Sequence, residues 1–258
     1  MNTLVQVGMN LPLFALVLCR ISGIVLAAPV YSNVSIPVRI KAALAVLIGL
    51  VMFPVATQYS GPLPTQLLGY LPLAVTEVGL GLIMGLAAAM VIGGLYAAGE
   101  IMSQQIGLAM AKVVSPDSST QMGAIAGLLG ILGLLLFITI NGHHWFVQAL
   151  AISYAKAPLG EVTWKPVLIT STLSAYSNLF VLAIKIAAPV VGIMFLVTVM
   201  IALLAKSVPQ MNILMVGYPV KICIGVSCMA FTLPFTLPVI RDAFNGLQSH
   251  LIQLARYL

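Results

Sequence analysis

Five ionisable side chains lie inside otherwise apolar stretches of the sequence, and they are its main candidates for chemistry. They are Arg20, Glu77, Glu100, Lys185 and Lys221. An ionisable group within an apolar helix is costly and commonly marks a functional site. Two interpretations stay open: an ion or proton relay that uses Glu77 with Lys185 or Lys221, or charges that bind helices to each other or to partner subunits. We favour the structural interpretation, because no second carboxylate lies beside Glu77 in the sequence.

The histidines and cysteines form no recognisable metal or catalytic arrangement. Adjacent His143 and His144 point to different faces of a helix, which argues against one shared metal ion, and neighbouring Trp145 is typical of a membrane–water interface. Three cysteines in apolar segments are predicted to be buried free thiols: Cys19, Cys223 and Cys228. Without a catalytic triad, a phosphate loop or zinc spacing, the sequence predicts no enzyme and no cofactor.

The composition is that of a membrane protein. Only 6% of the residues are charged and 61% are hydrophobic, whereas soluble domains carry about 25% charged residues. The long apolar runs predict helices, because a helix satisfies its own backbone hydrogen bonds across lipid. The net charge of +6 comes from scattered Lys and Arg residues, which argues against nucleic-acid binding.

The elements that must position these residues are six apolar segments, which predict six or seven hydrophobic helices. The segments span 4–29, 42–56, 67–98, 123–140, 167–205 and 211–240. The first lacks the basic start of a signal peptide and is expected to be a retained helix. The fifth is long enough for two passes or a hairpin, which Pro189 with Gly192 would kink or break. The cationic link at 30–41 predicts a cytoplasmic loop, but charge does not indicate the topology after the third segment.

Small residues and prolines suggest close but irregular helix packing. Glycines recur in the third and fourth segments, at positions 79, 81, 85, 123, 127, 130 and 133, and such spacing lets helix backbones approach closely. An ordinary bundle and tight packing against other subunits both explain this pattern. The late prolines, at positions 209, 219, 234 and 238, are expected to bend or end helices.

The stretch from Ala98 to Gly123 is too polar to span lipid and too apolar to be an ordinary solvated loop. Between 101 and 114, apolar Met102, Ile106, Met110 and Val113 recur at helical spacing. The opposite face carries Ser103, Gln104, Gly107 and Ala111. The pattern predicts a short amphipathic helix, followed by a Pro/Ser turn at 115–120. A surface helix usually has a strongly basic polar face, whereas Lys112 stands alone here, so we expect re-entrant packing in a pore.

Four sequence stretches, taken in order, resemble a known family. They are RISGIVLAAPVYSNVSIPVRIKAALA at 20–45, AGEIMSQQIGLAMA at 98–111, FITINGHHWFVQAL at 137–150 and PQMNILMVGYPVKICIGV at 209–226. With these motifs the chain resembles the FliR family of flagellar type III export-gate proteins, whose injectisome counterparts share the fold. The stretches are spread over nearly the whole chain, and their order makes the resemblance specific.

The resemblance implies an all-α membrane protein of kinked helical hairpins, forming one FliR-type domain over residues 1–258. Such a subunit resembles a fused FliP-like and FliQ-like unit. It would assemble with FliP and FliQ subunits into a helical export gate, with an FlhB-like protein at the rim, and it would not be an enzyme. The gate would lie in the bacterial inner membrane at the flagellar basal body, and unfolded rod, hook and filament subunits would pass through its centre.

The resemblance also assigns a role to the polar middle stretch, because in such gates a loop of the R subunit plugs the closed pore. The matching position is 106–122, and the implied plug residues are Ile106, Gly107, Met110, Lys112, Val113, Val114, Pro116, Asp117 and Met122. Family members often show Asp-Pro here, whereas this chain has Ser115-Pro116 with Asp117 one position later, so no carboxylate role carries over. The alternatives to an export gate are a small-solute or ion transporter that uses Glu77 with Lys185 or Lys221, and a membrane scaffold without a pore.

Overall fold

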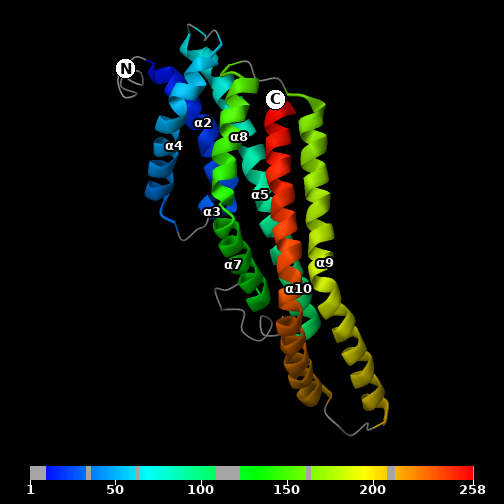
Figure 1. Ribbon diagram of the computed structural model, residues 1–258. Helices are drawn as coiled ribbons and strands as arrows, with labels where there is room; N and C mark the ends of the chain where they lie inside the picture. Colours follow the sequence, from blue (N-terminus) through cyan, green and yellow to red (C-terminus); the bar gives the residue numbers. More distant parts are fainter. Residues whose placement is uncertain are drawn as a thin grey trace. The chain divides into compact units, whose positions relative to one another are not determined.

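The computed structural model consists of helices throughout the part of the chain that it describes (Figure 1). This part comprises residues 10–32, 36–61, 64, 66–108, 123–160, 164–207 and 213–257. The elements are α2 (Leu11–Ala27), α3 (Pro29–Ser32), α4 (Val38–Gln58), η1 (Leu67–Gly69), α5 (Tyr70–Ile106), α7 (Ala124–Thr139), α8 (Gly142–Lys156), α9 (Pro166–Ser207) and α10 (Ile213–Tyr257). No strand occurs in these ranges, and the all-α prediction is confirmed.

Four of the described helices are long and apolar enough to cross a membrane, namely α4, α5, α9 and α10. Helices α7 and α8 together form a further candidate span, bent by 63° at the break between them. Helix α4 has 21 residues, which matches the roughly 20 residues that a crossing needs, and it extends beyond the apolar run at 42–56 on both sides. The protein is therefore a multi-pass membrane protein.

The two longest helices run through their prolines. Helix α9 has 42 residues and contains Pro189, so the expectation of two passes or a hairpin between 167 and 205 is wrong. Helix α10 has 45 residues and contains Pro219, Pro234 and Pro238, none of which ends it. At about 1.5 Å per residue, each helix extends over roughly 60 Å, about twice the hydrocarbon core of a bilayer. A proline removes one helical hydrogen bond, and neighbouring groups in a membrane helix can satisfy the freed carbonyl.

The chain divides into two compact units that are interleaved in sequence. The first comprises Met1–Met90, Phe137–Tyr176 and Phe244–Leu258, and the second comprises Val91–Leu136 and Ser177–Ala243. Helix α5 contributes to both units: its residues up to Met90 belong to the first unit, and those from Val91 onward belong to the second.

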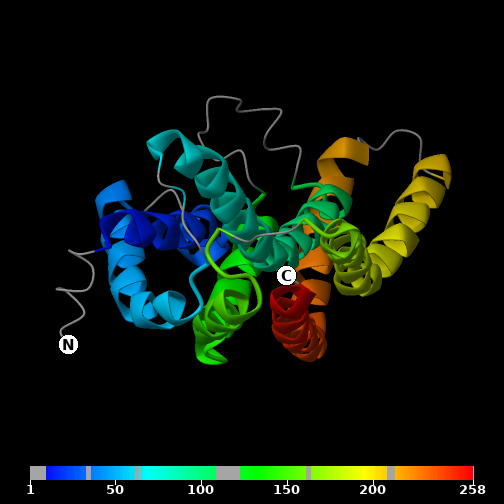
Figure 2. The same cartoon turned by 90° about the horizontal axis from the view of Figure 1, so that it is seen from above.

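Helix α2 lies at the centre of the first unit. Six of its eight buried residues recur at the spacing of one helix face: Leu13, Leu16, Val17, Arg20, Ile21 and Ile24. Helix α4 packs along another side of α2, as both views show (Figures 1 and 2). At this contact the rings of Phe14 and Phe53 pack edge to face, with 5.6 Å between the ring centroids. The buried face of α2 thus contains one charged residue among its apolar neighbours.

Glycines let the backbones of α2 and α5 touch. A Cβ atom at Gly81 would overlap the carbonyl of Arg20, and one at Gly23 would overlap the backbone of Val78. This is the close approach that small residues permit between membrane helices, and here it occurs within one chain. In the second unit, Gly130 of α7 similarly faces the ring of Tyr96.

The bend between α7 and α8 depends on a left-handed residue. Asn141 has a φ angle of 57°, a conformation that Asn tolerates better than most residues. After the bend, Trp145 and Phe146 pack with Phe137, which also contacts Phe244 of α10. Trp145 is only 9% exposed, and its ring belongs to this aromatic cluster. Its place at a membrane–water interface stays a prediction.

The last turns of α5 differ from the sequence-based prediction. Residues 101–106 continue α5 without a break, so the predicted separate amphipathic helix at 101–114 does not begin there. Met102 and Ile106 are buried and Gln104 is exposed, as the periodicity indicates, but Ser103 is also buried. The rest of the predicted helix lies outside the described residues.

Candidate functional site

A buried ion pair in the first unit is the main cluster of charge in the described part of the chain. The Nε atom of Arg20 on α2 donates to Oε2 of Glu77 on α5, and both side chains are fully buried. The remaining guanidinium donors reach α8, since Nη1 donates to Ser153 Oγ at 3.0 Å and Nη2 to the Ala157 carbonyl at 3.1 Å. One guanidinium therefore joins three helices.

The surrounding residues complete the binding of Arg20. The guanidinium carbon lies 4.5 Å from the centre of the Tyr154 ring, within the range of a cation–π interaction. The Tyr154 hydroxyl donates to the Val17 carbonyl at 3.4 Å, and the Ser153 hydroxyl donates to the Leu150 carbonyl at 2.8 Å. Ala157 caps the carboxyl end of α8, where free carbonyls favour a cation.

Sequence reasoning missed the contribution of α8, because residues 141–166 lie between the fourth and fifth apolar segments. The signal was present in the helical spacing of the residues that α8 buries, which are Phe146, Ala149, Leu150, Ser153 and Tyr154. Only the apolar members of this series raise the hydropathy. The serine and the tyrosine that contact Arg20 therefore left no hydropathy signal.

The proposed partners of Glu77 were Lys185 or Lys221, and the structure gives Arg20 instead. The physical reason is the glycine contact of α2 with α5, which places Arg20 beside the carboxylate. Lys185 is exposed on α9 and Lys221 is half-buried on α10, and both belong to the second unit. Oε1 of Glu77 is buried and has no hydrogen-bond partner among the described residues. A carboxylate held by a fixed cation between three helices favours a structural role over a relay.

The second candidate site is the end of α5 in the second unit, which bounds the predicted plug. Gly107 has a φ angle of 93°, and its N–H donates to the carbonyls of Ser103 and Gln104 at 3.1 and 3.2 Å, so α5 ends in a left-handed glycine. Ile106 is fully buried beside Gly225 of α10, where a Cβ atom would overlap its side chain.

The start of α7 returns to the same turns of α5. The N–H of Gly123 donates to Oε1 of Glu100 at 2.7 Å. Of the predicted plug residues, Ile106 and Gly107 are therefore placed, at the end of α5. The others lie outside the described residues: Met110, Lys112, Val113, Val114, Pro116, Asp117 and Met122.

The cysteines and histidines have varied surroundings. All three cysteines are free, but only Cys228 is buried, whereas Cys19 is half-buried and Cys223 is exposed, which corrects the prediction of three buried thiols. The His143 and His144 rings lie 4.2 Å apart. Within the described ranges, no three His, Cys, Asp or Glu side chains gather as metal ligands would.

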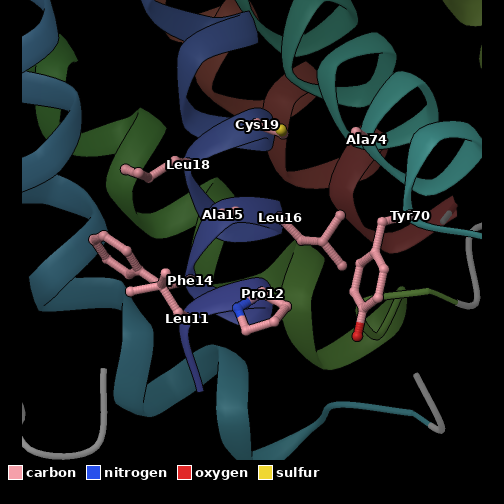
Figure 3. A pocket seen from close by; sticks show the side chains of 9 residues that line it. All are labelled: Leu11, Pro12, Phe14, Ala15, Leu16, Leu18, Cys19, Tyr70 and Ala74. Carbon is pink, nitrogen blue, oxygen red and sulfur yellow. The ribbon is translucent and has the colours of Figure 1, made fainter. Parts of the chain in front are cut away.

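An apolar hollow of 420 Å³ opens in the first unit between α2 and the start of α5 (Figure 3). Seven of its nine lining residues come from α2, and Tyr70 and Ala74 come from α5. In Figure 3 the side chains of Leu16 and Tyr70 face each other across it. None of the nine lining residues is charged, so the hollow offers no ionic group to a small charged solute.

Comparisons with known proteins show which family this sequence resembles. Residues 11–247 match the family model described as "Bacterial export proteins, family 1". The chain is 28% identical to the flagellar biosynthetic protein FliR of Escherichia coli (strain K12), over 88% of this chain and 87% of that protein. It is 28% identical to FliR of Caulobacter vibrioides, over 90% and 93% of the two chains. With FliR of Bacillus subtilis (strain 168) the identity is 26%, over 95% and 94%.

The matches cover both units and extend over most of every relative, and the relatives come from distant bacteria. The helices long enough to cross a membrane lie within the matched range or overlap it. The chain therefore belongs to the bacterial export proteins, family 1, and is a multi-pass membrane component of flagellar protein export.

Proposed function

We propose that this chain is a pore-forming subunit of the flagellar type III export gate, in which residues 106–122 plug the resting channel. The observation that carries the proposal is the interval between α5 and α7. Its two ends, at Gly107 and Gly123, are both bonded to the last two turns of α5. The fifteen residues between Gly107 and Gly123 are thus flanked on both sides by residues that are attached to α5.

The composition of this interval supports a plug. It is interrupted by Pro116 and carries Lys112 and Asp117, yet it also contains Met110 and Val113. Backbone outside a helix is tolerated at membrane depth only where protein buries it or where it lines an aqueous cavity. Methionine side chains repack easily and suit a seal that must be displaced by varied substrates.

The surface of the second unit supports assembly with other subunits. Along α9, large apolar side chains are more than half exposed, including Leu196, Met200, Leu203 and Leu204. We propose that FliP-like and FliQ-like subunits cover such surfaces, with an FlhB-like protein at the rim of the gate. The gate would lie in the inner membrane at the basal body and pass unfolded flagellar subunits.

Deletion of residues 110–119 in the assembled gate tests the plug. The deletion should raise the resting ion conductance of the reconstituted gate, because it removes the obstruction and leaves both anchored ends. Recovery of the deleted subunit with its FliP-like and FliQ-like partners serves as the control for assembly. A conductance that stays at the closed level in a fully assembled gate would falsify the plug assignment.

A further inference from the structure

We infer that Glu100 is a positioning residue of the gate, one that holds the start of α7 against the end of α5 and so fixes the base of the interval between them. The inference rests on the proposed plug and deepens it. Glu100 lies within α5, and its carboxylate accepts the Gly123 N–H at 2.7 Å across a separation of 23 residues.

Glu100 supplies an acceptor at the N-terminus of α7. Gly123, the residue before α7, has no side chain that could accept a hydrogen bond, and no acidic residue lies in the first turn of α7. The first N–H groups of a helix need an acceptor and favour a negative charge. A charge-assisted hydrogen bond between a carboxylate and a backbone N–H meets both needs, and here the carboxylate comes from another helix.

The absence of a side chain at position 123 permits the contact between the start of α7 and Glu100. A Cβ atom at position 123 would lie 2.9 Å from Ser103 Oγ and 3.2 Å from Glu100 Oε1. Glycine therefore allows the backbone to come close enough to the carboxylate to donate. Ser103 Oγ is itself buried and has no hydrogen-bond partner among the described residues, so the Gly123 contact with Glu100 is the polar attachment that the structure shows at this point.

The opposite end of the interval is fixed one to two turns further along α5. Gly107 ends the helix in a left-handed conformation, with the ring of Tyr218 where a Cβ atom would lie, and Ile106 is packed beside Gly225. Apolar packing with α10 holds this end. At the other end, the hydrogen bond from Gly123 to Glu100 lies beside a close backbone contact, since a Cβ atom at Gly99 would overlap Ala126 near the start of α7. The hydrogen bond to Gly123 is the part of this attachment that a substitution of Glu100 removes.

The test compares the assembled gate with Glu100→Ala, Glu100→Gln and the deletion of 110–119. We expect Glu100→Ala to raise the resting conductance, and Glu100→Gln to raise it less, because the amide oxygen can still accept from Gly123. Combined with the deletion, Glu100→Ala should add no further conductance. Gln104→Ala, at an exposed position one turn along the same helix, is the matched control and should leave conductance unchanged.

Hydrogen exchange gives a second measurement that does not depend on the pore. In the purified gate, Glu100→Ala should speed exchange of the Gly123 amide by on the order of tenfold or more, as expected for loss of a hydrogen bond to a charged group. Gln104→Ala should not change it. If Glu100→Ala does not assemble, Glu100→Gln, which preserves shape, decides the question by the same two measurements.

The outcomes separate this inference from the proposed function. If the deletion raises conductance but neither Glu100 variant does, the plug stands and the role of Glu100 is wrong. If the deletion itself leaves the gate closed, the proposed plug is wrong, while the exchange of the Gly123 amide in Glu100→Ala still decides whether Glu100 holds the start of α7. Unchanged exchange at Gly123 in Glu100→Ala would overturn the positioning role whatever the conductance.

Discussion

At the scale of single residues, Arg20 combines more partners than any other charged side chain for which the structure gives contacts. It joins α2 to Glu77 of α5 and to two positions of α8. Removing one member of a buried ion pair costs about 3–5 kcal/mol, because the other charge is left uncompensated, whereas replacing both with apolar residues can be close to neutral. The main effect of the pair is therefore to fix how α2, α5 and α8 pack together, and its contribution to net stability is small.

This difference predicts non-additive effects of substitution. Arg20→Met and Glu77→Met alone should each destabilise the subunit by about 3–5 kcal/mol, and the double variant should be less harmful than either single one. Thermal unfolding of the detergent-purified gate, together with the steady-state amount in membranes, measures this. Lys185→Met is the matched control, since it removes an exposed charge from an apolar helix. Additive losses in the double variant would contradict the prediction.

The sequence identified Arg20 and Glu77 as buried charges but not as each other's partners. They lie 57 residues apart, and nothing in the hydropathy of α2 or α5 indicates that their backbones touch. Glu100 was likewise singled out for its place near an apolar segment, while its bond to the Gly123 N–H depends on a backbone group that carries no sequence signal. The types of the site residues were predictable, and their partners depended on tertiary packing.

At the scale of helices, the glycine contact between α2 and α5 brings Arg20 and Glu77 together. A Cβ atom at Gly81 would overlap the backbone of α2, whereas Gly192 of α9 is exposed and has no atom within 4 Å of a Cβ position. Both glycines lie within helices, so alanine improves helix propensity at both. Alanine substitutions at the two positions therefore distinguish the effect of helix packing from the effect of helix propensity.

Gly81→Ala should destabilise the subunit by about 1–3 kcal/mol, because overpacking pushes α2 away from α5. Gly192→Ala should be neutral or should stabilise it by up to about 1 kcal/mol. Thermal unfolding of the two variants, assembled with the same partners, provides the comparison. Equal effects at both sites would show that the close contact of α2 with α5 does not limit stability.

Helix boundaries were less predictable than helix existence. The polar residues after Ala98 ended the apolar run of the third segment, yet α5 continues to Ile106 because Met102 and Ile106 bury its last turns. The prolines of α9 and α10 suggested breaks, yet both helices continue through them. In each case tertiary packing outweighed a local signal, and the local signal alone gave a shorter helix.

At the scale of the whole molecule, the described surface is too apolar for a subunit that acts alone in water. Helix α9 exposes a series of large apolar residues at helical spacing, including Leu196, Met200 and Leu203. The helix is roughly twice as long as a bilayer core is thick. Lipid can therefore cover only part of such a helix, and we propose that other subunits cover the remainder.

This reasoning predicts that α9 carries part of the subunit interface. Leu196→Glu should reduce the amount of FliP-like and FliQ-like subunits that co-purify with the chain several-fold, because a desolvated, unpaired charge in an interface is costly. Leu196→Met keeps the apolar character and nearly the volume, and it should leave co-purification unchanged. Quantitative mass spectrometry of the purified complex measures both variants against the unmodified chain. If Leu196→Glu lowers the amount of the chain in the membrane while the remaining chain still binds its partners in full, lipid rather than protein covers this face of α9.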